Sequence, residues 1–343
     1  MKRRTTIKDI AQQAGVSAAL VSMALNARFG PDGKPNCRVK KETILRIRDI
    51  AESLGYIPNN AAAQISSGKS RNIAVITSDI SNAFFAEISK HIENMAYESG
   101  YNVFFASSDE NSEKMKNVVY NLLRVGVDGF IMVPSSTDPD VLSHLRNLKM
   151  PVVFLERDIP EYAEAGRIVL DNEQTCRIAV RELYDAGCRH IEQITYDLNI
   201  STILQKNAGY YKAMEELGLS SVARISSVRH GANVAEMVEI VRDAAERGVD
   251  GLFLPTNTIT VRTLQAMKIL GLKVPDDIAI VGFDSCDLFY LNDPTISYIY
   301  QSTVDLAQMS FRMLLDMIEE NSGPATVILQ PQLVRGGSTM RSF

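Results

Sequence analysis

The sequence predicts an N-terminal all-α helix-turn-helix head followed by an α/β body of two parallel-sheet lobes. Three observations support this architecture. Apolar residues recur at helical spacing between residues 7 and 54. From residue 71 onward, short apolar strands alternate with helical segments, and the alternation restarts after Ile168. The chain has 343 residues, 45% of them hydrophobic, which suffices for two or three domains with sizeable cores.

The start of the chain predicts two short helices joined by a tight turn. In the first, Ile7, Ile10 and Ala14 share one face, and Gly15 ends the helix. Ser17 then caps the second helix. The apolar positions of this second helix are Leu20, Val21, Ala24 and Leu25.

Such a pair is either an ordinary αα-hairpin or a DNA-binding helix-turn-helix. Residues 1–70 hold 12 Lys and Arg against 5 Asp and Glu, a net charge of +7, whereas the remainder carries −12 of the total of −5. The attraction for phosphate is therefore confined to the head, and we favour DNA binding. The cations that precede or enter the first helix are Lys2, Arg3, Arg4 and Lys8.

A long loop and a third helix complete the head. The loop, residues 27–38, is rich in Gly, Pro and charge; its Arg28, Lys34 and Arg38 are either extra DNA contacts or solvated side chains. The third helix carries Ile44, Ile47, Ile50 and Leu54 on one face. Residues 59–70 follow as either a plain linker or a helix that forms only on DNA, because so short a helix is unstable alone.

The body is predicted from alternating strands and helices, which indicate parallel sheets covered on both faces. The expected strands are 73–77, 102–107, 129–133, 151–156, 168–171, 190–195, 224–228, 251–255 and 278–284. The expected helices are 83–99, 113–124, 138–149, 173–186, 201–217, 234–247 and 258–270. The phrases GVDGF (126–130) and GVDGL (248–252) repeat one helix-to-strand corner, which indicates two lobes of similar build.

Several classes of protein are disfavoured. The cysteines Cys37, Cys176, Cys188 and Cys286 fit no zinc or redox spacing, so we expect reduced thiols and no metal. The histidines do not cluster, and neither a Gly-rich phosphate loop nor a nucleophile elbow is present, so we expect no enzyme, no catalytic residues and no cofactor. No apolar run is long enough for a membrane span, and the charged N-terminus is unlike a signal peptide; we expect a cytoplasmic protein.

The chain resembles the lac repressor (LacI/GalR) family of bacterial transcriptional regulators over essentially its whole length. The motifs that carry the resemblance are TIKDIAQQAGVS, the spacing through Asn26, LGYIPN, SNAFFAEI, VDGFI, VGFDS and QLVRGGST. The resemblance implies a head at 1–58, a hinge helix or linker at 59–70, and an effector-binding and dimerisation domain at 71–343, similar to periplasmic sugar-binding proteins. Three crossovers would divide this domain into an N-lobe, about 71–165 and 297–322, and a C-lobe, about 166–296 and 323–343.

The DNA-binding residues are assigned in the same way. Ser17, Ser22 and Asn26 would contact phosphates, which fixes register without reading sequence. The resemblance places Ala18, Ala19 and Met23 at the base-reading positions, where long polar side chains are common in the family. Alanine and methionine pack against thymine methyls instead, so the operator is expected to be thymine-rich there or read partly by shape. The remaining DNA-binding candidates are Thr6, Asn59, Ala62 and Ile65, the last a minor-groove wedge.

The effector site is expected where the carboxyl ends of the strands face each other across a cleft. By resemblance, the candidates from the N-lobe and the crossover are Asn82, Phe84, Phe85, Glu156, Arg157 and Gln301. Those from the C-lobe are Lys206, His230, Asn257 and Asp284. Carboxylates and amides bind hydroxyls and aromatic faces pack on C–H surfaces, which suits a polyol, although Phe84 and Phe85 are equally explained as core. Leu204, Lys206 and Thr258 depart from common family residues, which leaves a sugar or an acidic effector open.

The resulting hypothesis is a homodimeric repressor that binds a pseudo-palindromic operator in double-stranded DNA and responds to a small, sugar-type effector. The ending QLVRGGST followed only by 340–343 favours a dimer over a tetramer. The alternatives are a transport-type sugar receptor, which the body alone resembles, and a regulator that responds to a nucleobase or nucleoside. Whether the effector releases the protein from DNA or recruits it depends on which state it binds better, which the sequence does not reveal.

Overall fold

The computed structural model describes residues 5–27, 29, 34–56, 69–135 and 139–341. The chain divides into two compact units, Met1–Ser70 and Arg71–Phe343. The first unit contains the predicted head and the second contains the predicted body, so the division follows the change from helical to alternating sequence. The predictions for Asn59, Ala62 and Ile65 lie outside the described residues.

The head consists of the helices α1 (Ile7–Ala14), α2 (Ala18–Asn26) and α3 (Lys41–Ser53) around one apolar core. Ile10, Val21, Ile44 and Ile47 are fully buried in it. Gly15, with φ 65°, turns the chain between α1 and α2, a conformation that glycine adopts at little cost. The Ser17 hydroxyl accepts a hydrogen bond from the Leu20 amide, which confirms the predicted cap of α2.

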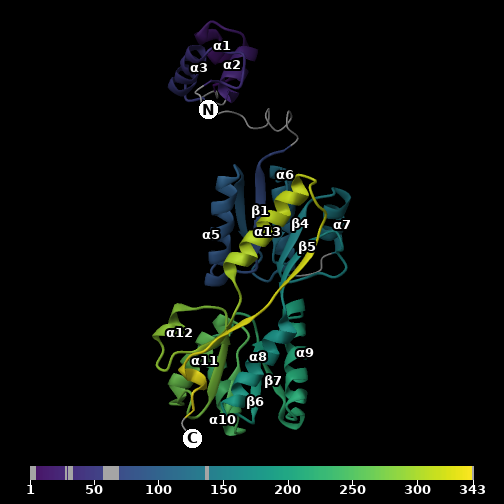
Figure 1. Cartoon of the computed structure of the whole chain (residues 1–343), viewed down its shortest axis with the longest axis vertical. Coiled ribbons are helices and arrows are strands. Elements are labelled where there is room, and N and C mark those ends of the chain that lie inside the picture. The colour runs from purple at the N-terminus through teal and green to yellow at the C-terminus, as the bar shows by residue number, and fades with distance from the viewer. Residues whose placement is uncertain (1–4, 28, 30–33, 57–68, 136–138, 342–343) are drawn as a thin grey trace. The chain divides into compact units, whose positions relative to one another are not determined.

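The first lobe of the body is a six-stranded sheet in which every pairing is parallel (Figure 1). The order across the sheet is β11 (Thr326–Leu329), β5 (Gly166–Leu170), β4 (Val152–Glu156), β3 (Phe130–Met132), β1 (Asn72–Thr77) and β2 (Asn102–Ser107). Alternate strand residues bury against α5 (Ala83–Glu98) and α13 (Thr303–Ile318) on one face, and α6 (Ser112–Val125) and α7 (Pro139–Asn147) on the other. The sheet is therefore covered on both sides, as parallel sheets require.

The second lobe repeats this plan. The order of its sheet is β12 (Gln332–Val334), β10 (Ser297–Tyr300), β9 (Ala279–Phe283), β8 (Gly251–Phe253), β6 (Ile191–Tyr196) and β7 (Arg224–Val228), and only β12 is antiparallel. The helices α8 (Asn172–Asp185) and α9 (Ser201–Glu216) cover one face, and α10 (Val234–Glu246) and α11 (Asn257–Leu270) the other. The short helix α12 (Asp287–Leu291) follows β9. The predicted fold of two parallel-sheet lobes is confirmed.

The three crossovers lie one strand later than predicted. Strand β5 belongs to the first lobe, although 166–296 was assigned to the second. Strand β10 belongs to the second lobe and β11 to the first, so the boundaries predicted at 297 and 323 are also too early. The reason is that the chain changes lobe after the carboxyl end of each strand, and the sequence of a strand does not reveal which sheet it joins. The chain therefore crosses near Asp171, Gln301 and Pro331.

Within the described part of the chain, none of the helices has the length and hydrophobicity that crossing a membrane requires.

Candidate functional site

A cavity lies between the two lobes, at the carboxyl ends of their strands. Its empty volume is about 960 Å³, part of which is open to solvent. The loops that follow parallel strands meet at this edge of each sheet, so residues distant in sequence gather there. Eight of the ten predicted effector residues line it: Asn82, Phe84, Phe85, Glu156, Arg157, Lys206, His230 and Asp284.

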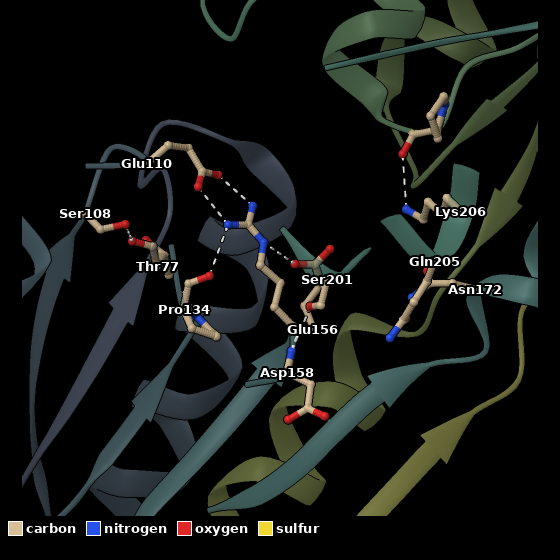
Figure 2. A network of polar contacts seen from close by, with 12 residues as sticks. Thr77, Ser108, Glu110, Pro134, Glu156, Asp158, Asn172, Ser201, Gln205 and Lys206 are labelled. Atoms are coloured by element: carbon tan, nitrogen blue, oxygen red, sulfur yellow. Dashed lines mark hydrogen bonds and ion pairs between the residues drawn. The ribbon is translucent and has the colours of Figure 1, made fainter. Parts of the chain in front are cut away.

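Arg157 is buried and fully engaged by acceptors of the first lobe. Its Nη1 and Nη2 donate to the Glu110 carboxylate at 2.7 and 2.6 Å, its Nε donates to Glu156 at 3.0 Å, and Nη1 also reaches the Pro134 carbonyl at 3.3 Å. Figure 2 shows these three acceptors gathered around one guanidinium. Burial alone would lower the pKa of Arg157, but the Glu156 and Glu110 carboxylates hold it above its ordinary value. The cation is thus permanent and its charge is already compensated.

Glu156 and Asp284 occupy equivalent places in the two lobes. Glu156 ends β4 and Asp284 follows β9, the third strand in the order of each sheet. Both have left-handed backbones, with φ 67° and 61°. A non-glycine residue adopts this conformation at a cost, and such strain concentrates at functional sites because the surroundings must impose it. The two lobes therefore present a carboxylate to the cavity by the same backbone device.

Asp284 is 7% exposed, and its Oδ1 accepts a hydrogen bond of 2.8 Å from Nε2 of Gln301. Burial raises the pKa of Asp284 to about 7, although the Lys206 ammonium and the Gln301 amide act in the opposite direction. The group is therefore divided between its acid and carboxylate forms near neutral pH. As an acid it donates a hydrogen bond to a ligand, and as a carboxylate it accepts two.

Lys206 is 5% exposed and extends from α9 toward the same carboxylate. Its Nζ donates to the Pro255 carbonyl at 3.2 Å and lies 3.6 Å from the centre of the Phe283 ring. Burial lowers the pKa of Lys206, while Glu156 and Asp284 favour its charged form. The aromatic face and the carbonyl partly replace the water that the ammonium has lost.

Phe84 and Phe85 serve as both core and lining. Each is 6% exposed, belongs to the apolar core of the first lobe and also borders the cavity. Their rings meet edge to face, with centroids 5.1 Å apart. On the opposite wall, Tyr196 and His230 form a similar pair at 5.2 Å. The cavity thus offers aromatic surface from both lobes.

Two predicted residues lie just behind the lining. Gln301 holds Asp284, as described above, and Asn257 donates from Nδ2 to Oδ1 of Asn82 at 3.2 Å, a hydrogen bond that joins the lobes. A second bond between the lobes runs from the Asp158 amide to Oγ of Ser201 at 3.1 Å, also visible in Figure 2.

Several lining residues were not predicted. Asp79 and Glu110 follow β1 and β2, where charged residues after a strand are expected to be solvated. Their position after strand carboxyl ends was the available signal. Part of the second-lobe wall is apolar, formed by Leu198, Ile200 and Ile203 around the start of α9. The other lining residues that sequence reasoning missed include Tyr196, Thr258, Arg262 and Phe283.

In the head, α2 presents the predicted DNA face to solvent. Ala18 and Ala19 are exposed and Met23 is 47% exposed, unusual for a large apolar side chain on a helix whose other face is core. Ser17 and Asn26 are also exposed, and Ser22 is half-buried. Thr6 caps α1 in a capping box with Asp9, so its side chain is already used structurally.

Comparisons with known proteins match both units. Residues 6–59 match the model for bacterial regulatory proteins of the lacI family, and residues 180–339 match a periplasmic binding protein-like domain. The chain is 29% identical to catabolite control protein A of Priestia megaterium, over 96% of this chain and 97% of that protein. It is 28% identical to a ribose operon repressor of Halalkalibacterium halodurans, over 92% and 91%. The structure of the lac repressor dimer bound to operator and the anti-inducer ONPF superposes with a TM-score of 0.82 at 23% identity, over 99% and 100% of the two chains.

Proposed function

Because the chain belongs to the lacI family of bacterial regulatory proteins, we propose that it is a transcriptional repressor whose operator affinity is set by a small molecule bound between its two lobes. The observation that carries this function is the combination in one chain of an exposed apolar and hydroxyl face on α2 with a polar, partly enclosed cavity in the body. A transport-type receptor has no use for the first of these features. The relatives are transcriptional regulators.

On the DNA side, we assign the phosphate contacts to Ser17, Ser22 and Asn26. Ala18, Ala19 and Met23 would face the bases in the major groove, where apolar side chains contact thymine methyls. The chain then binds as a homodimer to a pseudo-palindromic operator, since two copies of one reading face require two inverted half-sites. Such a regulator acts where the chromosome lies, which places it in the cytoplasm.

On the effector side, the cavity combines aromatic faces with carboxylate and amide groups. Hydroxyls pair with the polar groups, and the C–H faces of a sugar ring pack on the aromatic rings. The named relatives include a ribose operon repressor, and one solved structure of the family contains bound ribose. The ligand that fits this lining best is therefore a sugar or sugar derivative.

Regulation follows from the placement of the cavity. A ligand that contacts both lobes binds more tightly to one lobe arrangement than to the other, and so shifts the equilibrium between them. The head is attached to the first lobe ahead of β1, so a change in lobe arrangement alters how two heads of a dimer are presented to DNA.

The function is tested by selecting operator sequences from random double-stranded DNA with the full chain, then screening sugars and nucleosides for an effect on binding. We expect a pseudo-palindromic consensus and at least one active compound. The matched control is Ala19→Asp, which adds a charge that is tolerated in the first turn of a helix but repelled by phosphate. Equal DNA binding by this variant and the wild type, or the absence of any consensus, would exclude the proposed function.

A further inference from the structure

The charges inside the cavity are unusual in being almost entirely satisfied by one another. Three carboxylates, those of Glu110, Glu156 and Asp284, accompany two cations, Arg157 and Lys206. The Glu110 and Arg157 side chains are only 7% and 8% exposed, and Lys206 and Asp284 are equally buried. The chemistry that this cluster still has available therefore decides what it binds.

The cations have little left to offer. Four donor contacts of Arg157 go to Glu110, Glu156 and the Pro134 carbonyl, so the guanidinium does not present the two parallel N–H groups that bind a carboxylate or phosphate. Lys206 is directed at the Pro255 carbonyl and the Phe283 ring. An anion entering the cavity would meet more carboxylates than cations in this cluster.

Acceptors, in contrast, remain open. Among the described residues, the buried Oε1 of Gln301 has no hydrogen-bond partner, and it belongs to the amide that holds Asp284. Gln301 is 3% exposed, and an unpaired acceptor at this depth costs free energy until a donor arrives. Asp284 itself borders the cavity. Adjacent acceptors on Asp284 and Gln301 match a ligand that carries neighbouring hydroxyl donors.

We propose that the cavity takes an uncharged, hydroxyl-rich ligand and excludes sugar acids and sugar phosphates, because carboxylates of the chain already occupy the cations that an anion requires. This inference rests on the proposed function and narrows its ligand class. No ammonium group is needed either, since Asp284 can take up a proton and balance the three carboxylates against the two cations. Glu110 is then a specificity determinant, which excludes anions by occupying Arg157.

Two measurements on the full chain test this. The first compares thermal stabilisation of the wild type by matched ligands: ribose with ribose 5-phosphate, and glucose with gluconate and glucosamine. The second compares phosphate binding by Glu110→Ala, which uncovers Arg157, with binding by Glu113→Ala, which removes an exposed carboxylate from α6. Both variants keep the head unchanged, so phosphate bound by the head cancels between them.

We expect the uncharged member of a pair to stabilise the wild type most, and Glu110→Ala to bind inorganic phosphate at least about tenfold more tightly than Glu113→Ala, as a recovered charged contact implies. A wild type stabilised more by ribose 5-phosphate, gluconate or glucosamine than by the parent sugar overturns the inference. Equal phosphate affinity in the two variants also overturns it. If Glu110→Ala does not fold, the wild-type comparison still decides. A charged ligand that alters operator binding would refute this specificity while leaving the regulatory function intact.

Discussion

Asn82 and Asn257 join the two lobes at the starts of two helices. Oδ1 of Asn82 accepts the Phe84 amide as the cap of α5, and the same oxygen accepts Nδ2 of Asn257, the first residue of α11. One oxygen thus serves a helix end in the first lobe and a side chain of the second. The separation of the lobes is fixed at this point to within the length of a hydrogen bond.

This shared oxygen gives a prediction about stability. Asn82→Ala removes both the cap and the bond between the lobes, so it should cost about 1 kcal/mol more than Asn257→Ala, which removes only the latter. A double-mutant cycle measured by denaturant unfolding should give a coupling of about 0.5–1.5 kcal/mol. Strictly additive effects would mean that the bond contributes nothing in solution.

The second prediction concerns salt. The head carries a net charge of +7 while the remainder is acidic, so operator affinity should fall steeply as salt rises through release of counterions from the DNA. Binding isotherms over a salt series measure the slope. Lys34→Ala, at an exposed position of the loop before α3, should lower that slope by about one unit if the loop contacts a phosphate, and leave it unaltered if the side chain is only solvated.

The third prediction concerns sequence readout. Met23→Arg should leave the phosphate contacts in place and shift the preferred operator toward guanine at one position in each half-site, because an arginine binds guanine through two hydrogen bonds. Selection from random oligonucleotides with both proteins measures the change. An identical consensus would show that Met23 does not face the bases.

The fourth prediction concerns the effector. Asp284→Ala removes a charged hydrogen-bond partner, typically worth about 1.5–3 kcal/mol, so the variant should need an effector concentration about tenfold higher or more. Operator binding without effector should match that of the wild type. Effector titrations of an operator complex measure both quantities. A normal response would place the regulatory site outside this cavity.

The fifth prediction follows from the pKa of Asp284. Burial raises this pKa from 3.8 to about 7, so between these values the folded protein holds a proton that the unfolded chain releases. The stabilisation is complete below pH 4 and is lost as the pH rises through 7. Asp284→Asn should therefore gain stability relative to the wild type between pH 5 and pH 8, by up to about 3 kcal/mol at about 1.4 kcal/mol per pKa unit. The groups that act on Asp284 are Lys206, Gln301 and Glu156.

Thermal midpoints of the body transition at the two pH values measure this effect. The control is Asp287→Asn, at an exposed position three residues further along the chain. Equal pH dependence in the wild type and Asp284→Asn would show that the buried carboxyl is ionised throughout this range.

The alternation of strands and helices predicted the two sheets because each strand is buried on both faces and its apolar run is therefore continuous. The same signal could not place the crossovers, since β5, β10 and β11 look alike whichever sheet they join. Resemblance brought Arg157 and Asp284 to the cavity, but not Glu110, which lies 47 residues before its partner in a loop that reads as solvated. The choice between core and lining for Phe84 and Phe85 had no answer in the sequence, because both descriptions hold.

The second crossover has a consequence for how this protein can evolve. Gln301 lies in the short connection between β10 and α13, and it is also the residue that holds the Asp284 carboxyl in the cavity. A substitution that retunes ligand choice there also alters the stiffness of a strut between the lobes. Selection for a new nutrient signal would therefore change the gain of the response together with its specificity, and compensating changes should accumulate at the other two struts, near Asp171 and Pro331.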